Sequence, residues 1–252
     1  MTKKHLTILT GGSRGMGLAM GQQLLREGHV LISIARKTSE ALAREATDAR
    51  QLQQWQQDLS DSGEAARRLG TLLSSLHEDD WASLTLINNA GVIPRIAPLA
   101  QVPVDELLNA MRVGLEAPMA LTGAFLAATD AWRIPRKVLN ISSGLGRRPM
   151  ASQAAYCSSK AGMDHFTRCV ALEESRKPHG ARLCSLAPGV IDTDMQAQLR
   201  TANPAEFPDI GNFEALKADS RLTSTDEAAA RVLAYLQRGD FGTNPVADVR
   251  DA

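Results

Sequence analysis

Short apolar runs alternate with longer amphipathic stretches along most of the chain. The short runs are typical of buried β-strands, and the longer stretches repeat apolar residues at three- and four-residue spacing, which is typical of helices with one buried face. The predicted strands are 6–10, 30–35, 52–57, 84–87, 137–141 and 182–187. The predicted helices cover about 18–25, 62–76, 104–128, 156–172 and 227–236, with Pro118 as a place where the third could kink or restart.

This alternation of strand and helix predicts an α/β fold with one Rossmann-type, doubly wound parallel sheet and helices on both of its faces. A chain of 252 residues suits one such domain, so we expect a single domain over residues 1–252. The polar stretch 196–221, with Pro204 and Pro208, breaks the pattern. Long stretches of this kind are uncommon unless they cover a site, so we expect a substrate lid at 194–222.

The composition of the chain argues against several classes of partner and site. Apolar residues make up 44% of the chain, and 28 basic residues balance 28 acidic ones, which argues against a partner that is a nucleic acid or a membrane surface. The three cysteines and five histidines are scattered without metal-ligand spacing, so we expect no metal site and a reducing compartment. We find no signal-peptide pattern and no apolar run of about 18 residues, and we therefore expect a cytoplasmic protein.

A glycine-rich loop, Gly11 to Gly17, lies between the first predicted strand and the helix that follows it. Glycines let the backbone approach a phosphate, and a helix N-terminus offers free N–H groups and a partial positive charge. Strand, glycine loop and helix in this order indicate a dinucleotide site. The alternative is a glycine-rich turn without a ligand.

The second predicted strand runs into Arg36, and no Asp or Glu lies between Val30 and Ser39. A carboxylate here would bind a ribose hydroxyl, whereas an arginine attracts a 2′-phosphate, and Arg14 could add a second cation. We therefore predict NADP(H) rather than NAD as the cofactor. The alternative is that Arg36 is a solvated charge at the end of a strand.

Tyr156 and Lys160 lie four residues apart, so a helix would bring both side chains to one face. A nearby ammonium favours the phenolate, so we expect Lys160 to lower the pKa of Tyr156 and make it a proton donor or acceptor near neutral pH. The alternative is an ordinary surface pair.

Several motifs in one order resemble the short-chain dehydrogenase/reductase family, and the resemblance covers nearly the whole chain. The matching segments are Thr10-Gly11-x-x-x-Gly15-x-Gly17, Asn88-Asn89-Ala90-Gly91, Ser143, Tyr156-x-x-x-Lys160, and Pro188-Gly189 leading to Thr193. The resemblance implies hydride transfer between a nicotinamide and a carbonyl carbon, with a small carbonyl compound or alcohol as substrate. Tyr156 would donate the proton, Ser143 would hold the carbonyl oxygen, and Lys160 would also bind the nicotinamide ribose.

The resemblance also implies the cofactor contacts. Asp58 would lie near the adenine, although at a strand end it could instead order the turn. With the residues named above, the expected cofactor-binding set is Gly11, Ser13, Arg14, Met16, Gly17, Arg36, Asp58, Leu59, Asn89, Tyr156, Lys160, Ile191 and Thr193.

One position departs from the family. Gly114 stands where members usually carry an asparagine that helps hold a proton-carrying water, and Asn109 lies five positions too early to replace it. The leading hypothesis is an NADPH-dependent reductase of a small ketone or diketone. The departure motivates an alternative, a weakly active or inactive NADP-binding sensor or regulatory protein.

The segments 188–196 and 242–251 look like the sepiapterin reductase and benzil reductase branch. There an acidic residue near the end can anchor a pterin, and Asp248 stands in that place; the alternative is a surface aspartate. The expected substrates are therefore a pterin or an aromatic diketone, held by Ser143, Tyr156 and Asp248. The family habit of pairing two long helices, here around Leu107 and Phe166, implies a homodimer or homotetramer.

Overall fold

Seven strands form one parallel sheet in the computed structural model, which describes residues 3–251. The strand order is β3-β2-β1-β4-β5-β6-β7, and every neighbouring pair is parallel. The strands are β1 Lys4–Thr10, β2 Val30–Ala35, β3 Leu52–Gln56, β4 Trp81–Asn88, β5 Arg136–Ile141, β6 Arg182–Ala187 and β7 Val246–Asp248. The chain winds outward in one direction from β1 and in the other from β4, which opens a crevice at the carboxyl ends of these two strands.

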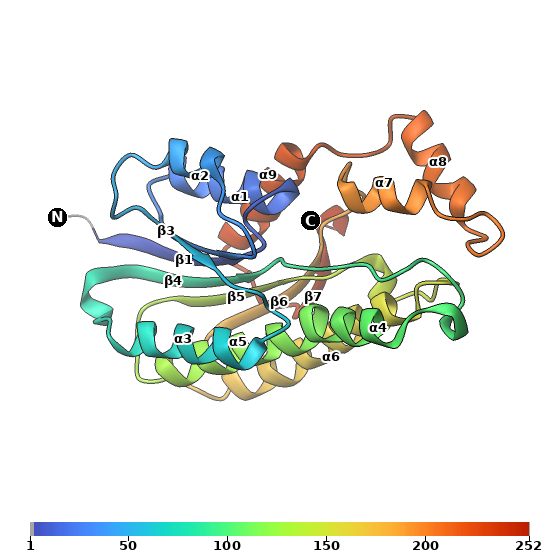
Figure 1. Ribbon diagram of the computed structural model, residues 1–252. Helices are drawn as coiled ribbons and strands as arrows, with labels where there is room; N and C mark the ends of the chain where they lie inside the picture. The colour runs from blue at the N-terminus through green and yellow to red at the C-terminus, as the bar shows by residue number, and fades with distance from the viewer. Residues whose placement is uncertain (1–2, 252) are drawn as a thin grey trace.

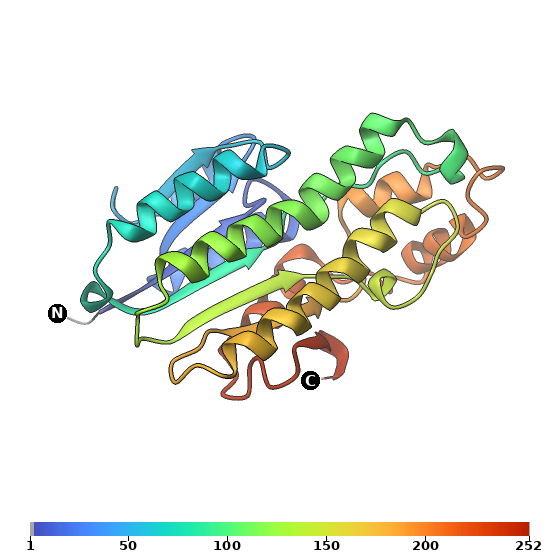
Figure 2. The ribbon, with the colours of Figure 1, turned by 90° about the horizontal axis from the view of Figure 1, so that it is seen from below.

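Helices cover both faces of the sheet, as predicted from the sequence (Figure 1). One layer holds α1 Gly15–Arg26, α2 Glu40–Glu45 and α9 Thr225–Gln237. The other holds α3 Ser62–Ser74, α4 Val104–Met111, α5 Ala117–Ala128 and α6 Ala154–Glu174. In Figure 2, α4 and α5 run end to end as one long helix, which lies between α3 and α6. The fold is therefore the predicted doubly wound, Rossmann-like sheet.

The stretch expected to be a lid folds into two helices, α7 Asp194–Arg200 and α8 Ile210–Ala218, set apart from the two main layers (Figure 1). They have a small apolar cluster of their own, in which Leu199, Phe207 and Phe213 pack with Ile96. The ring centroids of Phe207 and Phe213 lie 5.6 Å apart. Apolar contacts therefore order this polar segment; its role as a lid stays a prediction.

The expected long helix 104–128 contains a π-helical segment, Arg112–Glu116, between α4 and α5. Pro118 lacks an N–H, so the carbonyl of Gly114 has no α-helical donor four residues on, and a wider turn relieves this loss. Gly114 also packs against α6, because a Cβ there would lie 2.9 Å from Ser159 Oγ and 3.0 Å from Ser159 Cβ. Glycine is the residue that allows this approach of the two helices.

The helical layer of α4, α5 and α6 exposes Leu108, Met119 and Leu172. Leu107 and Phe166, around which pairing of two chains is expected, are only partly buried. The pairing itself stays a prediction. Within residues 3–251, no helix combines the length and the apolar character that crossing a membrane requires.

We expect Gly114→Ala to lower the free energy of unfolding by about 1 kcal/mol, because overpacking of about 1–3 kcal/mol exceeds the gain in helix propensity of about 1 kcal/mol. Urea denaturation measures this change. Gly123→Ala on α5 is the matched control: a Cβ there meets nothing within 4 Å, so it should stabilise the protein.

The contact with Ser159 is tested in a double-mutant cycle. Gly114→Ala should cost less in a Ser159→Gly background, where the crowding atoms are gone. An equal loss of unfolding free energy in both backgrounds would show that the contact with Ser159 is not the reason why position 114 requires glycine.

Candidate active site

A cleft of about 1250 Å³ follows the carboxyl ends of the strands. All the residues that the sequence assigned to a cofactor or a substrate line it. Pockets for single small molecules hold roughly 300–1,000 Å³, so this cleft has room for a long ligand and a second, smaller one.

The glycine loop forms one wall of the cleft. Gly11 and Gly15 adopt φ values of +71° and +56°, in the left-handed region that favours glycine. A Cβ on Gly17 would come within 2.1 Å of the Gly11 carbonyl oxygen, so this turn tolerates no larger residue. The N-cap residue of α1, Arg14, makes no side-chain capping bond, which leaves the first N–H groups of the helix free for an anion.

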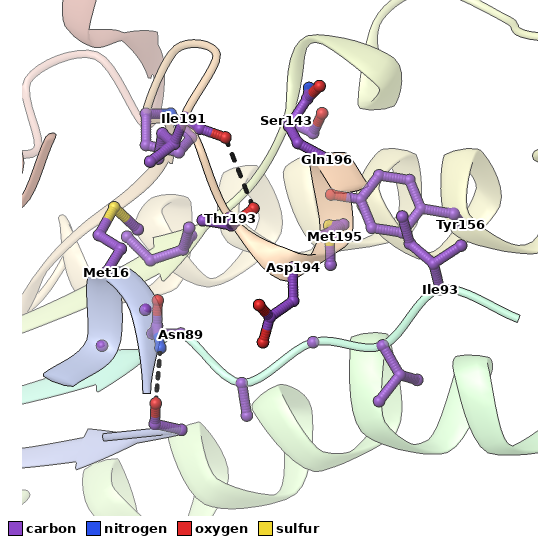
Figure 3. A pocket seen from close by; sticks show the side chains of 18 of the residues that line it. Met16, Asn89, Ile93, Ser143, Tyr156, Ile191, Thr193, Asp194, Met195 and Gln196 are labelled. Carbon is purple, nitrogen blue, oxygen red and sulfur yellow. Dashed lines mark hydrogen bonds between the residues drawn. The ribbon is translucent and has the colours of Figure 1, made fainter. Parts of the chain in front are cut away.

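Asn89 joins the glycine loop to the end of β4. Its Nδ2 donates to the carbonyl oxygen of Thr10 over 3.0 Å and to that of Gly11 over 3.4 Å, and the second of these bonds is drawn beside Asn89 in Figure 3. The Thr10 hydroxyl in turn accepts from the backbone N–H groups of Asn89 and Ala90. Two ligand-facing turns are thus fixed relative to each other, and the residues present fit a dinucleotide.

Cations lie at the far end of the cleft, where Arg36 and Lys37 follow β2. Asp58 accepts from the backbone N–H of Ser60 over 2.9 Å, which orders the turn after β3. This bond, together with the charge of nearby Arg36, holds the pKa of Asp58 below its ordinary value. Asp58 therefore orders its turn and also lines the cleft.

Arg14 makes a contact that the sequence did not predict. Its Nη1 donates to Asp194 Oδ2 at the start of α7 over 2.9 Å, and both side chains are exposed. The two residues are 180 positions apart, so no local pattern links them. The glycine loop and the 194–222 segment are therefore joined across the cleft by an ion pair.

Ser143, Tyr156 and Lys160 come together at the other end of the cleft. Figure 3 shows the hydroxyl end of Tyr156 directed into the pocket, on the side where Ser143 and Gln196 lie. Lys160 Nζ is 5.7 Å from the centroid of the Tyr156 ring and donates to the Ile141 carbonyl oxygen over 2.8 Å. Both side chains are buried, so the surface-pair alternative is wrong.

Burial dominates the acidity of this pair. It raises the pKa of the Tyr156 hydroxyl, against the effect of a hydrogen bond with Ser143. It lowers the pKa of Lys160 to about 8, against the charge of Asp164. The direction for Tyr156 is opposite to the one expected from spacing alone, because the loss of hydration outweighs the hydrogen bond with Ser143. Near neutral pH the phenol is therefore protonated and Lys160 is largely charged.

Asp248 lies at the end of β7 and is 5% exposed, so it is not a surface aspartate. Its oxygens accept from Arg250 Nε and Nη2 over 2.8 and 2.6 Å, which lowers the pKa of the carboxyl group. The cleft therefore has a charged, paired carboxylate where the sequence predicted one.

Some residues that line the cleft were missed. Asn109 was set aside because of its spacing, although it lines the cleft, and Gln153 lies one helical turn before Tyr156. Gln196 and Arg200 belong to α7, a helix that the sequence pattern did not predict. The three-residue spacing from Tyr156 and from Thr193 is the signal that would have found Gln153 and Gln196. Among residues 3–251, no group of three His, Cys, Asp or Glu side chains is placed to hold a metal ion.

Comparison with known proteins adds to this geometry. A family profile described as short chain dehydrogenase matches residues 5–204. Benzil reductase ((S)-benzoin forming) of Bacillus cereus is 36% identical over 93% of this chain and 94% of its own length. Sepiapterin reductase of Mus musculus is 31% identical over 97% of this chain and 96% of its own. A crystal structure of a short-chain dehydrogenase/reductase from Burkholderia vietnamiensis superposes with a TM-score of 0.68 at 31% identity, covering 100% of this chain and 99% of that one.

Proposed function

The chain belongs to the short-chain dehydrogenase family, and from this membership we propose that it is an NADPH-dependent oxidoreductase that reduces a small ketone or diketone. The observation that carries the proposal is the convergence of Ser143, Tyr156 and Lys160 at one end of a cleft whose other end holds the glycine loop and Arg36. The cleft has the length for a dinucleotide and a substrate together.

Ser143, Tyr156 and Lys160 have different roles in the reduction of the carbonyl group. NADPH, when bound, supplies the hydride that the carbonyl carbon receives. Tyr156 gives its hydroxyl proton to the carbonyl oxygen, which becomes the alcohol. The Ser143 oxygen accepts from the backbone N–H of Leu145 over 3.1 Å, which leaves the Ser143 hydroxyl to donate toward Tyr156 and the substrate oxygen. The Lys160 ammonium stabilises the phenolate left on Tyr156.

The acidity of the site supports the direction of reaction. Reduction needs a protonated phenol, and burial raises the pKa of Tyr156. Oxidation would need the phenolate, which the same burial disfavours. Near neutral pH the phenol is therefore in the protonation state that carbonyl reduction requires.

Arg36 supports NADPH over NADH. Arg36 lines the cleft together with Lys37, and β2 ends without a carboxylate that would repel a 2′-phosphate. Arg14 shares its charge with Asp194 and so contributes less to this attraction.

The names of the relatives suggest the substrate class. One group reduces benzil, an aromatic diketone, and the other sepiapterin, a pterin. The buried Asp248 carboxylate suits the N–H donors of a pterin, which benzil lacks. Both compounds therefore belong in the first substrate panel.

Gly114 supports a second candidate, an NADP-binding regulatory protein with little or no turnover. The space beside Gly114 is filled by Ser159, and glycine offers no side-chain amide there. Tight NADPH binding without turnover across a broad carbonyl panel would favour this candidate.

The proton donor is tested with Tyr156→Phe. We expect kcat for NADPH oxidation with benzil or sepiapterin to fall by about 10²–10⁴-fold, since only the proton donor is lost. Tyr235→Phe on α9, which alters the second of the two tyrosines, should leave kcat near the wild-type value. An unchanged rate in Tyr156→Phe would reject this role.

The cofactor preference is tested with Arg36→Asp. We expect KM for NADPH to rise about tenfold or more while KM for NADH changes little, because a charge pair near water is worth about 1 kcal/mol or more and the variant reverses its sign. Arg44→Asp, on the exposed helix α2, is the matched control and should leave both values unchanged. Equal losses for the two cofactors would refute the preference.

The pH dependence of kcat tests the role of Lys160. The ammonium prevails below its pKa of about 8 and is lost above it. We therefore expect kcat for reduction to fall as pH rises through about 8, whereas Lys160→Met should be slow and lack this alkaline limb. A wild-type profile that stays flat to pH 10 would contradict the assignment.

A further inference from the structure

Helix α6 carries a buried acid behind the reacting pair. Tyr156, Lys160 and Asp164 follow each other at four-residue intervals, so they form one stripe along the inner face of the helix. Asp164 is only 2% exposed. A buried carboxylate is costly unless its oxygens are bonded and its charge is paired, so its neighbours matter.

Three side chains from different elements satisfy Asp164. Oδ1 accepts from the hydroxyls of Ser142 and Ser185, both over 2.6 Å. Oδ2 accepts from Arg147 Nε over 3.2 Å. The carboxylate therefore ties α6 to the end of β5, to β6 and to the segment after the short 3₁₀ turn Gly144–Gly146.

These bonds hold the Ser143 loop at both ends. Ser142 precedes Ser143 and also donates its backbone N–H to the Leu186 carbonyl oxygen over 2.9 Å. Arg147 follows the 3₁₀ turn, and its Nη2 donates to the Ala247 carbonyl oxygen over 2.7 Å, next to Asp248. The Asp164 carboxylate thus bonds one residue on each side of the loop that carries Ser143.

The same carboxylate acts on Lys160 through its charge. Burial lowers the pKa of Lys160 to about 8, and Asp164 opposes this change. From α6, Tyr156 faces Lys160, and burial raises the pKa of its hydroxyl. From β6, Cys184 faces Asp164, and burial raises the pKa of its thiol to about 11, so both groups are neutral near pH 7.

The charged groups around the carboxylate complete this picture. Arg147 binds Asp164 directly through its guanidinium. Asp248, beyond Arg147 at β7, is paired with Arg250. Asp164, on the same helix as Lys160, is therefore the anion near this lysine. Asp164 also bonds the loop that contains Ser143.

We propose that Asp164 is a positioning residue for the reaction, which fixes the loop that carries Ser143 and keeps Lys160 charged; this rests on the proposed function. Replacing a buried ion pair by apolar groups is often neutral or stabilising, so stability alone does not explain the network. Asp164 itself does not touch the reacting atoms.

The first experiment compares pH profiles of kcat for NADPH-dependent reduction of benzil and sepiapterin. Asp164→Asn keeps the shape and removes the charge, so the alkaline limb should move down by about one pH unit and kcat at pH 7 should fall about twofold, as the charged fraction of Lys160 drops to about one half. Arg147→Met removes one of the two bonds that hold the Ser143 loop and keeps the Asp164 carboxylate, so kcat should fall severalfold while the alkaline limb does not move to lower pH. Ser185→Ala keeps the Asp164 charge and the bonds of Ser142 and Arg147, so the alkaline limb of its pH profile should stay in place.

The second experiment needs no turnover. Lys160 has a lower pKa in the folded protein than in the unfolded chain, so above about 8 the unfolded chain binds more protons and stability rises with pH. In Asp164→Asn, the rise of Tm with pH should therefore begin at a lower pH than in the wild type. In a Lys160→Met background, Asp164→Asn should not change the pH dependence of Tm.

The outcomes separate the two proposals. Asp164→Asn with a lower rate but unmoved kinetic and thermal profiles would make Asp164 merely structural and overturn the inference. Arg147→Met with wild-type kcat would overturn the loop-holding part, even if Asp164→Asn failed to fold. A shifted thermal profile in a protein that turns over no carbonyl compound would instead refute the proposed function and leave the coupling of Asp164 to Lys160 standing.

Discussion

An ammonium group buried in the protein is the constraint on which the site depends. Lys160 is 4% exposed and so has lost most of its hydration. The ammonium group donates a hydrogen bond to the Ile141 carbonyl oxygen, and Asp164 supplies the opposing charge. Because the ammonium must be compensated from the end of β5 and from its own helix, the position of α6 against the sheet is tightly defined. That position in turn sets where the Tyr156 hydroxyl lies in the cleft.

The parts of the fold that the sequence predicts well are those whose signal is local. The buried strands are mostly apolar runs in the sequence. The glycines from Gly11 to Gly17 predict a turn that needs left-handed backbone. The short strand β7 has three residues and depends on pairing with β6, so it leaves little trace in the sequence. Helices α7 and α8 depend on apolar contacts with Ile96, which comes from a distant segment.

The chemistry of the site shows the same division. Spacing places Tyr156 and Lys160 on one face of a helix, but spacing carries no information on burial, and burial sets the direction of both pKa changes. The bonds of Asp164 escape prediction because Ser142, Arg147 and Ser185 come from separate elements. Gly114, which reads as a departure from the family, is also a packing residue, since Ser159 occupies the space that a side chain would need.

The ion pair between Arg14 and Asp194 has a different character from these buried contacts. Both groups are exposed, and such pairs contribute at most about 1 kcal/mol and weaken with salt. The glycine loop and α7 are thus joined by a weak, exposed contact, whereas the Tyr156 end of the cleft rests on the buried hydrogen bonds of Asp164. The cleft is consequently held more firmly around the reacting pair than between the glycine loop and α7.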